Sequence, residues 1–103
     1  SLVPWRILKN AVNNCVSVSD KYVPQTLTML AKKKFSYKKI IAGECSTSGV
    51  ISLISCCNNS LVKKKLEINE KSNILIIGCE GNTDKKFYDK LYKIGNQRLK
   101  KYD

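Results

Sequence analysis

Two short segments carry the residues of this chain that are best suited to chemistry. The first is Gly43-Glu44-Cys45, and the second is Gly78-Cys79-Glu80-Gly81. Each places a glycine next to a carboxylate and is followed by a hydroxyl-rich stretch that is typical of a helix start. This pairing is the most informative feature of the sequence.

Other kinds of chemistry are disfavoured by composition. The chain has no histidine, which removes the usual general base and the common catalytic triads. Its five cysteines are odd in number, irregularly spaced and without a C-x-x-C pair, so neither a structural zinc site nor a secreted disulfide framework is expected. We expect reduced thiols in a cytoplasmic protein, no metal site, and no nucleophilic role for Cys45.

Each candidate segment follows a short apolar run. Lys39–Ala42 and Asn73–Ile77 are predicted strands, because they are apolar without alternation. Helices are predicted after them, over Val50–Cys57, apolar nearly all round, and over Asp84–Ile94, with Gly95 as its C-terminal stop. Strands interleaved with helices favour an α/β fold with a parallel sheet, in which ligands bind beyond the carboxyl ends of the strands.

The rest of the chain is predicted to support these two units. A helix is expected over Trp5–Val12, a short strand over Cys15–Val18, and a helix from about Val23 to Lys33 with Val23, Leu27 and Leu30 on one face. One helical turn is expected within Leu61–Leu66 of a Lys-rich connector. We predict a domain over residues 1–95 and a basic, flexible tail over 96–103.

The charge balance is strongly basic. Among 103 residues, 19 are Lys or Arg and 8 are Asp or Glu, a net charge of +11. Nearly all the basic residues are lysines, whereas readers of phosphates and bases usually use arginine. We therefore interpret the runs Lys32–Lys34 and Lys63–Lys65 as solvated surface and expect no nucleic-acid partner. The longest apolar runs are far short of a membrane helix, and no membrane partner is expected.

Two or three short strands do not make an independent parallel sheet, because the outer strands leave backbone groups and apolar faces uncovered. The chain also begins with Ser1 and not Met. Both observations favour a portion of a longer enzyme that begins mid-protein or has been processed.

The two loops also resemble a known family. Residues 77–84, Ile-Gly-Cys-Glu-Gly-Asn-Thr-Asp, resemble the S/N-T-E-G-D/N-T-D signature near the C-terminus of diaminopropionate ammonia-lyases, and residues 42–49 resemble their G-E-S-G-A-x-G segment. The resemblance extends over residues 4 to 95. It implies the C-terminal part of a three-layer parallel-sheet domain with the tryptophan synthase β-like fold. Family members are homodimeric pyridoxal-phosphate enzymes of amino-acid catabolism, which convert 2,3-diaminopropionate to pyruvate and ammonia.

The resemblance also implies a set of cofactor-binding residues. Glu44 would lie on the pyridine side of pyridoxal phosphate, Cys79 would lie beside the ring nitrogen, and Gly81 would permit close backbone approach. The full implied set is Gly43, Glu44, Cys45, Gly78, Cys79, Glu80 and Gly81. This sequence departs from the family at Cys45, which replaces Ser, at Ser46-Thr47, which replaces Gly-Ala, and at Gly78, which replaces a polar residue.

Nothing in the chain matches the family's Schiff-base lysine or its phosphate loop. We therefore predict no catalytic residue here and expect activity only with the missing N-terminal part as partner. Two alternatives stay open, a related threonine or serine dehydratase fragment and a small basic module that binds nucleic acid.

Overall fold

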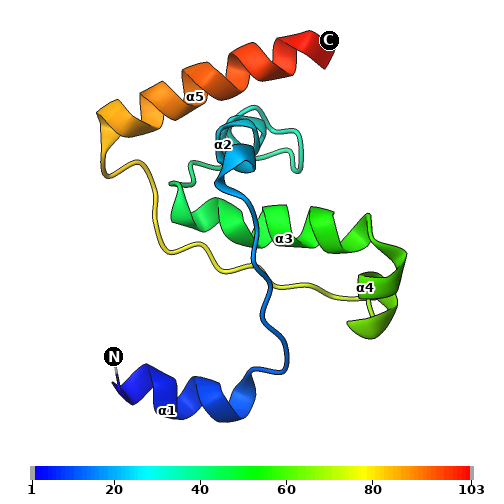
Figure 1. The fold of residues 1–103 in the computed structure, drawn as a ribbon. Helices are drawn as coiled ribbons and strands as arrows, with labels where there is room; N and C mark the ends of the chain where they lie inside the picture. The colour runs from blue at the N-terminus through cyan, green and yellow to red at the C-terminus, as the bar shows by residue number, and fades with distance from the viewer. Residues whose placement is uncertain (1, 103) are drawn as a thin grey trace.

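A computed structural model describes residues 2–102, and all regular structure within them is helical (Figure 1). Extended segments and short 3-10 turns connect the helices. The elements are α1 (Leu2–Ala11), η1 (Asp20–Tyr22), α2 (Val23–Ala31), η2 (Cys45–Thr47), α3 (Ser48–Cys57), α4 (Ser60–Lys65), α5 (Lys85–Leu99) and η3 (Lys100–Tyr102).

The predicted α/β class is therefore wrong, and so is the three-layer parallel sheet of the tryptophan synthase β-like fold. The segments 15–18, 39–42 and 73–77 are not strands. A strand needs a neighbour that pairs along its length, and stable sheets need about three or more of them. Here one backbone hydrogen bond, from Gly43 N–H to the Glu80 carbonyl at 2.8 Å, joins the chain just beyond segments 39–42 and 73–77. Apolar character alone mispredicted strands where the chain is extended but unpaired.

The core lies where α2 crosses α5. The predicted face of α2 is confirmed, because Val23, Leu27 and Leu30 are all buried. At the crossing, a Cβ on Gly95 would overlap the Pro24 carbonyl oxygen and the Thr28 hydroxyl. Gly95 is thus a close-packing residue inside α5 and not the predicted stop, and residues 96–99 of the predicted tail form the last turn of α5.

Polar contacts fix the same crossing. The Thr28 hydroxyl donates to the Pro24 carbonyl at 2.8 Å and lies 3.2 Å from the Tyr92 carbonyl of α5. Arg98 on α5 donates to the Lys21 carbonyl and to the Gln25 side chain, both at 2.7 Å. These bonds set the position of α5 along α2, and the chain that contains Glu80 leads directly into α5.

Helix ends follow local rules. The predicted start of α5 is confirmed by Asp84, whose carboxylate accepts from the Phe87 N–H at 3.1 Å. Helices α2 and α4 each end with a left-handed residue, Lys33 (φ 61°) and Glu67 (φ 58°). Glycine is the usual residue at such a position, since a side chain there meets the backbone.

Much apolar surface is left uncovered. Helix α1, predicted over Trp5–Val12 and found over Leu2–Ala11, has no buried residue, and Trp5 is 59% exposed. Helix α3, predicted to be buried all round, buries only Ile51 and Cys56. In segment 73–77, Leu75 is 84% exposed. No helix in the described range is long and apolar enough to cross a membrane.

Candidate functional site

The two glycine–carboxylate segments lie side by side in the structure. Glu80 holds them together through its backbone. Its carbonyl accepts from the Gly43 N–H at 2.8 Å and from the Ser46 hydroxyl at 2.7 Å, and its N–H donates to the same hydroxyl at 2.8 Å. Two segments that are 34 to 37 residues apart in the sequence are thereby joined at the residues predicted to form a site.

Close packing reinforces this junction. A Cβ on Gly43 would overlap the Gly81 carbonyl oxygen and lie 2.7 Å from the Glu80 Cγ. A Cβ on Gly78 would lie 3.2 Å from the Ser46 Cβ. Gly43 is therefore required by the approach of a second backbone, whereas Gly78 leaves slightly more room.

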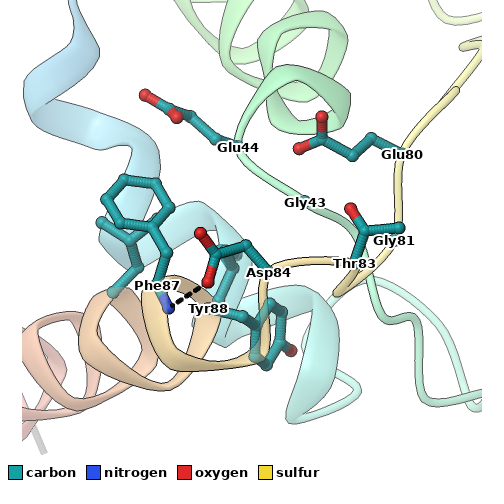
Figure 2. Close-up of a pocket in the computed structure, with 10 residues that line it drawn as sticks. Gly43, Glu44, Glu80, Gly81, Thr83, Asp84, Phe87 and Tyr88 are labelled. Atoms are coloured by element: carbon teal, nitrogen blue, oxygen red, sulfur yellow. Dashed lines mark hydrogen bonds between the residues drawn. The ribbon is translucent and has the colours of Figure 1, made fainter.

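A cavity of about 200 Å³, the acidic pocket, opens at this junction (Figure 2). Three carboxylates line it, Glu44 and Glu80 from the two segments and Asp84 from the start of α5. One Asp84 oxygen is already used to cap α5. The complete lining is Leu27, Gly43, Glu44, Glu80, Gly81, Thr83, Asp84, Phe87, Tyr88 and Leu91.

All the charged residues that line the acidic pocket are acidic. Its lining residues include three carboxylates and the hydroxyls of Thr83 and Tyr88 but no lysine or arginine, in a chain of net charge +11. Such a pocket favours a protonated ring nitrogen or an ammonium group over an anion. A pyridine ring with its nitrogen toward the carboxylates fits, but the phosphate of pyridoxal phosphate finds no cationic partner in this lining. The volume is also below the roughly 300–1,000 Å³ of complete ligand sites.

The carboxylates also act on a neighbouring thiol. Cys45 is exposed, and its pKa is raised chiefly by the Glu80 carboxylate, with smaller contributions from desolvation and from Glu44 and Cys79. Negative charge nearby disfavours the thiolate. At neutral pH Cys45 is therefore a protonated thiol, a poor nucleophile and a possible hydrogen-bond donor.

The acidic pocket is also lined by a buried phenol, Tyr88. Burial raises the pKa of Tyr88, with smaller contributions from Tyr92 and Asp89. Its hydroxyl has no hydrogen-bond partner among the described residues. The Tyr88 ring stacks on Tyr92, one turn further along α5, with centroids 6.4 Å apart.

The structure gathers some of the predicted site residues and separates others. Gly43, Glu44, Glu80 and Gly81 line the acidic pocket. Cys45 lines a neighbouring cavity of about 360 Å³, which also contains Asp20. Gly78 packs on Ser46, and Cys79 is exposed and lines neither cavity.

Two contributors were missed by sequence reasoning. Ser46 was noted only as a departure from a family pattern, yet its buried hydroxyl holds both backbone groups of Glu80. Phe87, on the first turn of α5, also lines the pocket and was not among the predicted site residues. The sequence signal that could have identified Ser46 is a hydroxyl three residues after the glycine of the first candidate segment.

Comparisons with known proteins reveal a distant and partial relationship. No protein-family model and no solved structure matches the chain. Over 87 residues it is 28% identical to the diaminopropionate ammonia-lyases of Escherichia coli strains K12, O6:H1 and O157:H7. The match covers 82% of this chain but only 22% of each of those enzymes. The chain thus spans about a fifth of the length of the curated relatives that it matches.

Proposed function

We propose that this chain is the C-terminal segment of a pyridoxal-phosphate-dependent lyase related to diaminopropionate ammonia-lyase. The observation that carries the proposal is the junction at Glu80. The two stretches that resemble lyase motifs meet there, held by Gly43 and Ser46. The 28% identity to the bacterial enzymes supports the same assignment.

In this proposal the acidic pocket is one wall of the cofactor site. Glu44 and Glu80 face the nitrogen side of the pyridine ring and stabilise positive charge there, while Gly43 and Gly81 keep the backbone close to the ring. Cys79 is assigned to the same wall through its position in the motif, with a small adjustment of the exposed segment that carries it. When bound, pyridoxal phosphate supplies the electron sink for elimination of ammonia from a diamino acid.

The rest of the enzyme must come from further polypeptide. The pocket lining offers no cation for a phosphate and no lysine to hold the cofactor. The uncovered apolar residues of α1 and of segment 73–77 are where we place that partner, because a ten-residue helix is marginal in water without packing. The matching share of the bacterial lyases, 22%, leaves most of such a catalytic domain to be supplied. Homodimerisation of the completed enzyme and an amino-acid substrate belong to the same proposal.

Complementation tests this function. The bacterial lyase is expressed without the stretch that matches this chain and is mixed with this chain and pyridoxal phosphate. We expect visible absorbance of bound cofactor, and ammonia release from 2,3-diaminopropionate, only when both pieces are present. Absence of both signals, with the pieces shown to associate, contradicts the lyase assignment.

A pair of glutamate variants locates the cofactor. Glu80→Gln should shift the cofactor absorbance in the complemented enzyme, because a charge near the ring is removed. Glu70→Gln, which removes an exposed carboxylate outside the pocket, is the matched control. Equal cofactor spectra for the two variants would show that Glu80 does not lie near the pyridine ring.

A further inference from the structure

A strongly basic loop, the lysine loop, follows α2 and lies outside the acidic pocket. This loop, residues 32–39 with the sequence Lys-Lys-Lys-Phe-Ser-Tyr-Lys-Lys, connects α2 to segment 39–42. It contains five lysines, and no acidic residue occurs between Lys21 and Gly43. Positive charge is thus concentrated in one short surface element.

The loop is closed at its base. Lys34 N–H donates to the Met29 carbonyl at 3.0 Å, and Ile40 N–H donates to the Leu30 carbonyl at 3.1 Å. Inside the loop, the Ser36 hydroxyl bonds the backbone of Lys38 at 2.9 and 3.2 Å. The loop is therefore a compact protrusion from the end of α2, which Figure 1 shows as the turquoise segment beside that helix.

Its aromatic residues face water. Tyr37 is 93% exposed and Phe35 is 44% exposed, and Ile40 and Ile41 directly after the loop are also exposed. Removal of these side chains from water would be favourable, so their exposure together within seven consecutive residues is consistent with an interaction site. The lysine loop thus presents both lysine ammonium groups and exposed aromatic side chains.

The neighbouring helix extends the basic surface. Lys32 Nζ donates to the Asn96 side chain of α5. Lys93 of α5 and Lys100, which caps the end of that helix, lie three and four residues from Asn96, hence on the same side of the helix, and both are exposed. Together with the lysine loop they form a basic patch with no acidic side chain in its sequence segments.

We propose that the lysine loop docks the protein on anionic membrane surfaces. Clusters of four to eight lysines bind the headgroups of acidic lipids, and two signals together give stable attachment. Here the lysines supply the electrostatic signal, and Phe35 and Tyr37 enter the boundary between headgroups and acyl chains. Lysine in place of arginine, and isoleucines beside the aromatics, favour a lipid surface over nucleic acid. This inference is independent of the lyase proposal and departs from the sequence-based expectation of no membrane partner, because the exposure of the aromatics is a property of the folded chain.

Vesicle binding tests the proposal. The full chain is sedimented with vesicles of phosphatidylcholine alone, or with about a quarter phosphatidylserine. We expect binding to the anionic vesicles only, weakening as salt rises. Replacement of Lys33, Lys34, Lys38 and Lys39 by Gln should lower the partition coefficient at least about tenfold. Replacement of Lys63, Lys64, Lys65 and Lys71 by Gln removes the same charge elsewhere and should have a much smaller effect. Equal losses in the two variants would overturn the proposal.

Two further measurements test how the loop binds. In a chain with Trp5→Phe and Tyr37→Trp, the single tryptophan reports on the loop, and its emission should shift to the blue on anionic vesicles. An unshifted emission from bound protein contradicts insertion. In competition, an excess of single-stranded oligouridylate should leave the vesicle binding largely intact. Tighter binding to the oligonucleotide than to the vesicles would assign the loop to nucleic acid and overturn the membrane proposal.

Discussion

Two parts of this molecule use apolar residues in opposite ways. Where α2 crosses α5, Leu27 is fully buried and Gly95 allows the backbones to meet. Along α1 and segment 73–77, side chains of the same type are exposed, with Leu75 at 84%. An apolar pattern in the sequence therefore identifies side chains that favour burial. Whether they are buried depends on whether another segment packs against them.

The largest expected effect contrasts two leucines across these parts. Leu27→Ala should lower the free energy of unfolding by about 2–5 kcal/mol, because it opens a cavity in the packed crossing. Leu75→Ala should change it by less than about 0.5 kcal/mol, because that side chain already faces water. Chemical denaturation of both variants checks this. Similar losses would mean that segment 73–77 is packed as well as the crossing.

The next largest effect is expected at the junction of the two glycine–carboxylate segments, where the backbones are in contact. Gly43→Ala should destabilise the chain by about 1–3 kcal/mol, because the new methyl group overlaps the Gly81 carbonyl. Gly81→Ala is the control, since its Cβ would come no nearer than 3.8 Å to the atoms around it. Thermal unfolding of the two variants measures the difference. Equal midpoints would indicate that the segments are not in contact.

A smaller effect concerns the helix end that leads to the lysine loop. Lys33→Gly should stabilise the chain by about 1 kcal/mol, because it removes a side chain from a left-handed backbone position. Lys34→Gly removes the same charge without that relief and should not stabilise. Denaturation midpoints distinguish the two. A loss of stability in the Lys33 variant would contradict the left-handed geometry.

The smallest effect is a titration and does not involve folding. Glu80→Gln should lower the pKa of Cys45, because the carboxylate that chiefly raises it is gone. More thiolate is then present at neutral pH, so alkylation of Cys45 should be faster in this variant than in the parent chain. The rate as a function of pH, followed by mass spectrometry of the Cys45 peptide, gives the shift. Glu70→Gln should leave the rate unchanged, and an unchanged rate in the Glu80 variant would place that carboxylate away from the thiol.

Helices were the predictable part of the fold. The apolar spacing of α2, the start of α5 at Asp84 and the short turn that became α4 were all predicted from local patterns and confirmed. Strands were not predictable in the same way. An apolar run such as 73–77 lacks any local signal that distinguishes a paired strand from an extended segment without a partner, because pairing is a non-local property.

For the candidate site, the sequence nominated two segments by residue type and by resemblance, and the structure shows that they lie together. It also shows what local reasoning could not supply. Ser46 bonds Glu80 across 34 residues, and the carboxylates of Glu44, Glu80 and Asp84 surround one opening. The contact of Cys79 with a ring nitrogen stays a prediction.

Local sequence was sufficient to predict the starts of α2 and α5, the strongly basic charge, and the segments that combine glycine with a carboxylate, because each of these depends on neighbouring residues alone. Only the tertiary structure decided that Gly95 is a crossing point, that Glu80 is the junction of the two segments, and that Phe35 and Tyr37 face water. Those features depend on contacts between residues far apart in the chain, which local propensity and spacing do not encode.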